Sequence, residues 1–121
     1  MVKYFFDTYA LIEITKNKPN YIKFVEETIA TSKFNLVELI YITLSDLGEE
    51  SAKKIFQRFK DSEIGIPDDI LFKAMIFRFR NRKKGLSYVD CIGYVFALEN
   101  GLTFLTGDSA FENMENVEFV K

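Results

Sequence analysis

The chain has 121 residues, 48% of them apolar and 28% charged, which fits one soluble globular domain over residues 1–121 and argues against disorder. There is no histidine and a single cysteine, Cys91, which excludes an internal disulfide, a Cys/His zinc site and a Ser-His-Asp or Cys-His catalytic arrangement. The formal net charge is −2, unlike that of a dedicated duplex-DNA binder, so any surface for nucleic acid must be local.

Nothing in the sequence indicates export or a membrane span. Asp7 interrupts the apolar N-terminus too early for a secretory signal peptide. Asp90 breaks the most apolar helical segment, so no stretch is long enough to cross a bilayer. We therefore expect a cytoplasmic protein without a membrane partner.

The first half of the chain combines one strand pattern with several helical patterns. Residues 2–6 are mostly apolar and predict a strand. Residues 11–14 indicate a brief helix, and apolar residues between 21 and 29 recur at helical spacing. Asn35 is expected to open a further helix that runs to about residue 47, and Gly48 lies just past its end.

The second half alternates helices with short apolar strands. Helices are expected at residues 52–59, 67–81 and 87–99, and strands at residues 64–66, 102–106 and 117–120. Helix 52–59 is amphipathic, and we expect its apolar side to pack in the core rather than to bind another chain. This alternation predicts an α/β sandwich with a mostly parallel sheet.

Four acidic residues lie where an apolar run meets a turn or the start of a helix. Asp7 follows the first strand, and Asp108 follows the strand that ends at residue 106. Glu38 and Asp90 are each expected in the first turn of a helix. Ligands of such folds bind beyond the carboxyl ends of the strands, so all four acids are expected at one edge of the sheet.

Each acid taken alone has an ordinary structural explanation. Asn35-x-x-Glu38 and Ser87-x-x-Asp90 have capping-box spacing, and the other two acids could cap a helix or a turn. However, Glu38 and Asp90 lie in apolar stretches, where an unpaired charge costs on the order of several kcal/mol. A shared divalent cation would satisfy them, and ion pairs with distant Arg or Lys side chains are the alternative.

Four short motifs carry a family resemblance: Phe5-Phe6-Asp7-Thr8, Asn35-Leu-Val-Glu38-Leu, Gly85-Leu-Ser87-Tyr-Val-Asp90 and Leu105-Thr106-Gly-Asp108-Ser-Ala-Phe111. In their order, spacing and context they resemble the PIN-domain family, and within it the VapC-like toxin ribonucleases. The resemblance covers nearly the whole chain. It implies a three-layer α/β/α sandwich around a mostly parallel sheet.

The resemblance also implies a metal-dependent ribonuclease. Its catalytic, metal-binding acids would be Asp7, Glu38, Asp90 and Asp108, holding Mg²⁺ or Mn²⁺. The supporting side chains would be Thr8, Asn35, Ser87 and Thr106. A metal-activated water would hydrolyse an RNA phosphodiester bond, which agrees with the absence of histidine.

The implied partners are an RNA substrate, a VapB-like antitoxin and a second copy in a homodimer. A basic segment just before Ser87 could contact RNA phosphates: Arg78, Arg80, Arg82, Lys83 and Lys84. We favour the ordinary explanation that these cations stabilise a helix C-terminus and face solvent. Two other functions stay open, a PIN nuclease of RNA processing or decay without an antitoxin, and a non-catalytic PIN-like module that binds RNA or protein.

Overall fold

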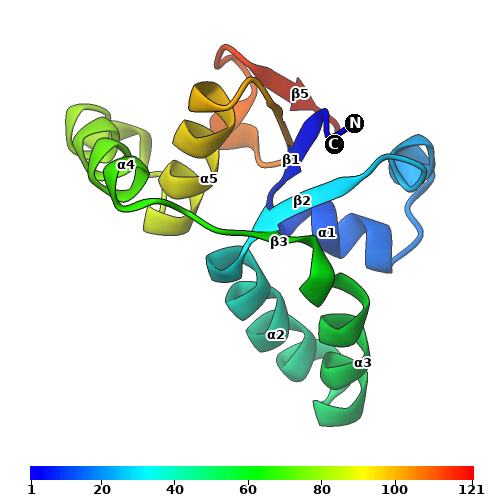
Figure 1. Ribbon diagram of the computed structural model, residues 1–121. Coiled ribbons are helices and arrows are strands. Elements are labelled where there is room, and N and C mark those ends of the chain that lie inside the picture. Colours follow the sequence, from blue (N-terminus) through cyan, green and yellow to red (C-terminus); the bar gives the residue numbers. More distant parts are fainter.

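The computed structural model describes residues 1–121 and is built around a five-stranded parallel sheet with the order β3-β2-β1-β4-β5 (Figure 1). The strands are β1 (Tyr4–Phe6), β2 (Ile29–Ser32), β3 (Glu63–Ile64), β4 (Thr103–Thr106) and β5 (Val117–Phe119). Every strand pair is parallel, so the predicted parallel α/β sheet is confirmed. Parallel neighbours need crossover connections, and helices supply most of them.

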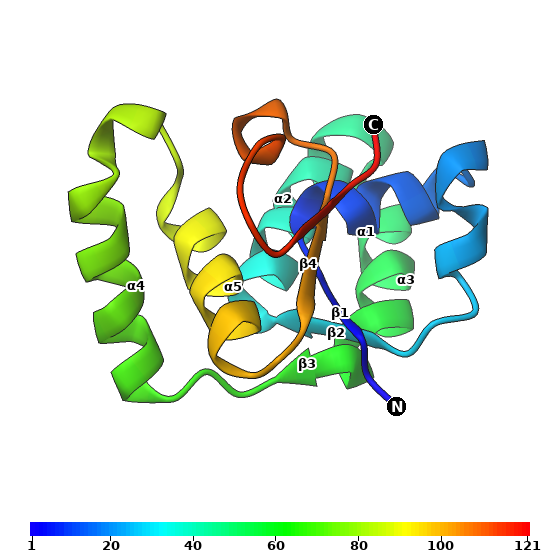
Figure 2. The same ribbon diagram turned by 90° about the horizontal axis from the view of Figure 1, so that it is seen from above.

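Helices cover both faces of this sheet, which makes the three expected layers (Figures 1 and 2). The helices are α1 (Thr8–Thr15), α2 (Lys33–Leu47), α3 (Glu49–Phe59), α4 (Asp68–Arg80) and α5 (Tyr88–Glu99). α1, α2 and α3 form one layer, and α4 packs on α5 in the other. None of the helices combines the length and the apolar character needed to cross a lipid bilayer.

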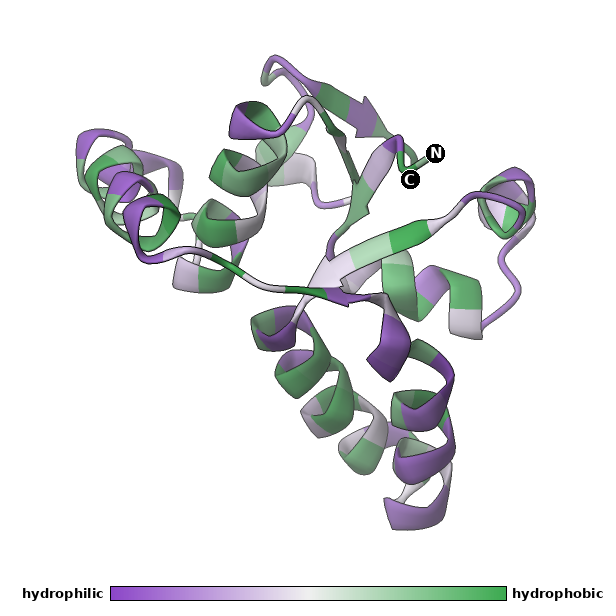
Figure 3. Cartoon of the chain, in the orientation of Figure 1, coloured by the Kyte–Doolittle hydropathy of each residue, from purple (hydrophilic) through white to green (hydrophobic).

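Alternating side chains of the central strands supply two separate cores. Phe5 of β1 and Phe104 of β4 are register partners and pack toward α5, whereas Phe6 and Leu105 pack toward α1 and α2. Figure 3 shows the central strands coloured mainly as apolar. At Gly93 of α5, an added Cβ would lie 2.6 Å from Phe5 Cε1, so this glycine lets the helix approach the sheet closely. α5 is therefore buried on all sides over residues 91–97, as its apolar sequence predicts.

The expected packing of residues 52–59 in the core is also confirmed. Ala52 and Phe59 of α3 are buried, and Ile55 and Phe56 are half-buried against the core shared with α1 and α2. The apolar side of this helix is thus largely used within the chain.

The helix predicted from the spacing of apolar residues over 21–29 is wrong. The structure has a short 3-10 helix, Pro19–Phe24, followed by strand β2. Tyr21 and Phe24 are both buried, so their spacing arises from one short packed turn and not from a longer helix. β2 contains Ala30, a residue that does not favour strands by itself, and its conformation depends on pairing with β1.

Several boundaries also differ from the expectation. α1 begins at Thr8 because Asp7 caps it, and α2 begins two residues before Asn35 because Ser32 caps it. β3 is shifted to Glu63–Ile64, and Pro67 precedes the first helical residue of α4. Each shift follows from a cap or strand partner that hydrophobic periodicity does not register.

Candidate functional site

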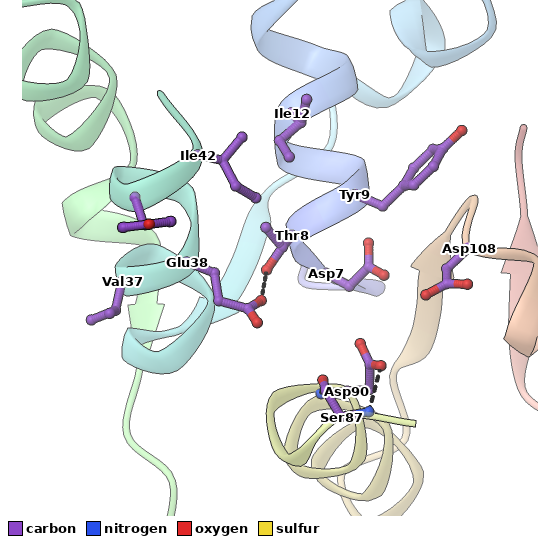
Figure 4. Close-up of a pocket in the computed structure, with 11 residues that line it drawn as sticks. Asp7, Thr8, Tyr9, Ile12, Val37, Glu38, Ile42, Ser87, Asp90 and Asp108 are labelled. Carbon is purple, nitrogen blue, oxygen red and sulfur yellow. Dashed lines mark hydrogen bonds between the residues drawn. The ribbon is translucent and has the colours of Figure 1, made fainter. Parts of the chain in front are cut away.

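A pocket of about 660 Å³ opens at the carboxyl edge of the central strands (Figure 4). The chain runs from β1 to β2 on one side and later adds β4 on the other, so this edge is a topological switch point. All four predicted acids line the pocket, namely Asp7, Glu38, Asp90 and Asp108. The structure therefore brings together acids that lie far apart in the sequence, from Asp7 near its start to Asp108 near its end.

Asp7 is the deepest of these acids and is 4% exposed. It follows β1 and caps α1, because its Oδ1 accepts a hydrogen bond from the Ala10 amide at 2.8 Å. The pKa of Asp7 is raised from 3.8 to about 7, chiefly by burial and to a smaller extent by the charges of Asp90 and Asp108. Hydrogen bonds from the Thr106 side chain and the Ala10 amide act in the opposite direction. Asp7 is a carboxylate whose charged form lacks sufficient compensation within the chain.

Asp90 enters the pocket from the first turn of α5. Its Oδ2 accepts from the Ser87 amide at 2.9 Å, and its own amide donates to Ser87 Oγ at 3.0 Å, so the predicted capping box is present. Burial raises the pKa of Asp90, hydrogen bonds from Ser87 oppose this, and the charge of Asp108 adds to it. Figure 4 shows the Asp90 carboxylate directed toward Asp7 and Asp108. The cap thus fixes a side chain that also faces the pocket.

Asp108 comes from the turn after β4 and is half-buried. One of its oxygens accepts from the Ala110 amide at 3.0 Å, and its amide donates to Thr106 Oγ1 at 3.0 Å. The expected turn-stabilising role of Asp108 is therefore present. Thr106 is buried beneath the turn and positions it.

Glu38 lies across the pocket and is held by a chain of polar side chains. Thr8 Oγ1 donates to Glu38 Oε1 at 2.6 Å, Asn35 Nδ2 donates to Thr8 Oγ1 at 3.0 Å, and Ser32 Oγ donates to Asn35 Oδ1 at 2.6 Å. The Asn35 amide also donates to Ser32 Oγ at 3.2 Å. Ser32 is the residue that sequence reasoning missed, although Ser32-x-x-Asn35 has N-cap spacing.

Two expectations about Glu38 are wrong. It lies in the second turn of α2, not the first, and it does not form a capping box with Asn35. It is also half-buried, as is Asp90, so the supposed deep burial of these two acids is not observed. Glu38 lies beside the exposed apolar side of α2, where Tyr41 is 75% exposed. The deeply buried acid is Asp7 instead.

The donor chemistry of the pocket suits a hard divalent cation. No Lys or Arg lines it, and none of the four acids takes part in an ion pair, so ion pairs with distant cations do not neutralise them. No group of three carboxylates converges closely enough to enclose an ion. Mg²⁺ usually binds through one or two carboxylates and keeps several waters, so these residues fit such an ion with water completing its shell.

The basic segment lies outside the acidic pocket. Arg78 Nε donates to the Leu86 carbonyl at 3.0 Å, and its guanidinium lies 4.2 Å from the Tyr88 ring centroid. Arg82 Nη1 donates to the Phe79 carbonyl near the end of α4 at 2.8 Å, as the structural explanation expects. A separate shallow hollow is lined by Arg80, Asn81, Arg82, Lys83 and Lys84.

The PIN domain family model matches residues 4–117 of this chain. The chain belongs to the PIN domain family. The resemblance inferred from the four sequence motifs is therefore confirmed. No curated protein matches the sequence significantly.

Solved structures of VapC and VapBC proteins have the same fold as this PIN domain. Mycobacterium tuberculosis VapC20, a Sarcin-Ricin loop cleaving toxin, superposes with a TM-score of 0.80 at 15% identity over 98% of this chain and 100% of VapC20. DNA-bound VapBC from Salmonella typhimurium gives 0.77 at 24% identity over 98% and 97% of the two chains. VapBC2 from Rickettsia felis, bound to a promoter DNA fragment, gives 0.76 at 22% identity and full coverage of both chains.

Proposed function

We propose that this PIN-domain protein is an endoribonuclease that depends on Mg²⁺ or Mn²⁺. The observation that carries the proposal is the acidic pocket itself. Four carboxylates from separate parts of the chain line one cavity at the switch point of the sheet, without a cationic side chain among them. Clustered carboxylates of this kind are ligands for a hard cation rather than for an anionic substrate alone.

The four acids would divide the work by position. Asp7 and Asp90 are proposed as direct ligands, because both carry raised pKa values that a bound cation would lower again. Glu38 and Asp108 would ligate or orient waters from the two sides of the pocket. When bound, the cation would polarise the phosphodiester and lower the pKa of the attacking water.

The hydrogen bonds around the acids would keep them in position during the reaction. The cap contacts of Asp7, Asp90 and Asp108 each engage an oxygen of the carboxylate and so fix its orientation at the pocket. Thr8 and Asn35 hold Glu38 through their side chains. Such preorganisation limits the loss of side-chain entropy when ligands bind.

The biological role that we propose is that of a toxin paired with a VapB-like antitoxin. VapC and VapBC structures among the fold neighbours support this role. A PIN nuclease of RNA processing without an antitoxin is the second candidate, and a small reading frame beside the gene would favour the toxin. All four acids are retained, which weighs against a module that only binds. The homodimer stays a prediction.

RNA cleavage with and without Mn²⁺ tests the proposed activity. We expect cleavage by the native chain in Mn²⁺, none in EDTA, and none by Asp7→Asn in either condition. Asp61→Asn is the matched control, because Asp61 is exposed in the turn before the amino end of β3, away from the pocket. Cleavage that persists in EDTA, or that Asp7→Asn retains at the native rate, would overturn the proposal.

A further inference from the structure

Tyr88 is an exposed aromatic side chain next to the acidic pocket. It is the first residue of α5 and directly follows Ser87, which lines the pocket, at the usual Cα spacing of about 3.8 Å. Tyr88 is 61% exposed and belongs to neither apolar core. It also takes part in no contact between aromatic rings. Its ring therefore has no apolar partner within the chain.

One face of the Tyr88 ring is held by an arginine. The guanidinium carbon of Arg78 lies 4.2 Å from the ring centroid, and Arg78 Nε donates to the Leu86 carbonyl at 3.0 Å. Leu86 is buried, so this hydrogen bond ties the guanidinium to a fixed part of the fold. A planar guanidinium attracts the face of an aromatic ring and stacks on it. The chain thus orients the ring and leaves most of the tyrosine in contact with water.

Packing between α4 and α5 explains little of the Arg78–Tyr88 contact. Phe77 of α4 already packs against the buried Tyr94 of α5, with ring centroids 5.3 Å apart. A ring that only fastened the two helices would stabilise them most when buried, because apolar stabilisation grows with the area removed from water. Figure 2 shows the short connection from the end of α4 to the start of α5, where Tyr88 lies. An oriented, exposed ring beside a cavity is instead suited to stacking on a ligand.

The charges around Tyr88 favour a nucleic acid as that ligand. Residues 80–84, shortly before it, carry four cationic side chains. Neither these nor Arg78 forms an ion pair within the chain, so their charge is available to phosphates. On the other side of Tyr88 along the chain, Ser87 and Asp90 line the acidic pocket. A strand with an anionic backbone and flat bases would match the ring and the cations together.

We propose that Tyr88 is the stacking platform for an unpaired base of the RNA, next to the phosphodiester that enters the acidic pocket. This inference rests on the proposed ribonuclease function and adds a substrate class to it, single-stranded RNA. A base within a duplex is already stacked and paired, whereas an unpaired base can turn out and cover an aromatic side chain. Every base has an aromatic face, so the platform selects for an unpaired strand rather than for a sequence. Arg78 is a positioning residue that holds the ring.

Binding of short single-stranded RNAs that carry 2-aminopurine tests the platform without cleavage. The native chain should bind them and quench the fluorescence of one position, in EDTA and, by rapid mixing, in Mn²⁺, because stacking on a ring quenches 2-aminopurine. Tyr88→Leu should bind roughly tenfold more weakly, lose this quenching and keep the native salt dependence, since it removes a ring and no charge. Tyr88→Phe should behave as the native chain. Phe72→Leu is the matched control, because Phe72 is 73% exposed but lies near the amino end of α4.

Steady-state cleavage in Mn²⁺ separates the platform from the nuclease activity. Tyr88→Leu should raise KM for single-stranded RNA roughly tenfold with little change in kcat, as expected for a contact made equally before and during the reaction. The same strand in a perfect duplex should be a poor substrate of the native chain. Arg78→Lys keeps the charge without the planar group and should give a smaller loss of binding in the same direction. Thermal melts ensure that only folded variants are compared.

The outcomes for the platform and for the nuclease are distinct. Native-like quenching and KM in Tyr88→Leu, or an equal loss in Phe72→Leu, would overturn the platform while the nuclease stands. Cleavage of the duplex as fast as of the single strand would also overturn it, and so would a native chain that quenches no position of the RNA. A native chain that shows the Tyr88-dependent quenching but cleaves nothing in Mn²⁺ would support the platform and overturn the proposed activity.

Discussion

The buried carboxylate of Asp7 should make the metal-free fold less stable as the pH rises. The pKa of Asp7 is about 7 in the folded chain, compared with an ordinary value of 3.8 for an exposed aspartate. Between these values the folded state holds a proton that the unfolded state has lost. The free energy of unfolding therefore falls as the pH rises through this window and is level above it.

The size of this effect follows from the pKa displacement. At about 1.4 kcal/mol per pH unit, moving the pKa from 3.8 to about 7 corresponds to about 4 kcal/mol for this group. The whole side chain is buried, so solvent screening reduces this little. Asp7→Asn keeps an oxygen that can accept from the Ala10 amide but carries no charge, and asparagine is a good N-cap. The variant should therefore lack this part of the pH dependence.

Urea unfolding in EDTA at about pH 4 and about pH 8 measures the difference. We expect the native chain to lose about 4 kcal/mol more than Asp7→Asn between the two conditions. Asp90 also has a raised pKa, but it is present in both proteins and its contribution largely cancels. At about pH 8, Mn²⁺ at about one hundred times its dissociation constant should stabilise the native chain by about 2.7 kcal/mol and the variant far less. Equal pH slopes in the two proteins would refute the reasoning about burial, and equal stabilisation by Mn²⁺ would refute Asp7 as a ligand.

Two further variants separate capping from catalysis and test the basic segment. Ser87→Ala should lower stability by about 1 kcal/mol in thermal melts but preserve RNA cleavage. Asp90→Asn should abolish cleavage with a similar or smaller loss of stability. Equal cleavage by the two variants would contradict a separate role for Asp90. Charge reversal of Arg82 and Lys83 should weaken RNA binding. If both side chains contact phosphates, the slope of the logarithm of the binding constant against the logarithm of the salt concentration should become shallower by roughly 1.4. An unchanged salt dependence, measured by fluorescence anisotropy, would leave these cations with the helix-end role alone.

Local sequence patterns predicted much of the fold because strong signals mark most of its elements. Helix α5 is apolar all round and lies between a capping box and a glycine, so its position and burial were predictable. Strand β2 was missed because it is only four residues long and mixes Ile29 and Thr31 with Ala30 and Ser32, which do not favour strands, and because its partners β1 and β3 lie elsewhere in the sequence. Ser32 was missed as the cap of α2 for the same reason, since it is also the last residue of that unrecognised strand.

The sequence by itself determined the chemistry available to this protein. Two acids at strand ends, two in early helical turns and the absence of histidine together indicated a carboxylate-based site, whatever the detailed packing. Only the tertiary structure decided how those carboxylates differ. Burial depends on neighbours from distant segments, which is why Asp7 is deeply buried while Glu38 and Asp90, in more apolar sequence, are half-exposed. The strand order likewise placed β1 between β2 and β4, and that arrangement brings the four acids to one pocket.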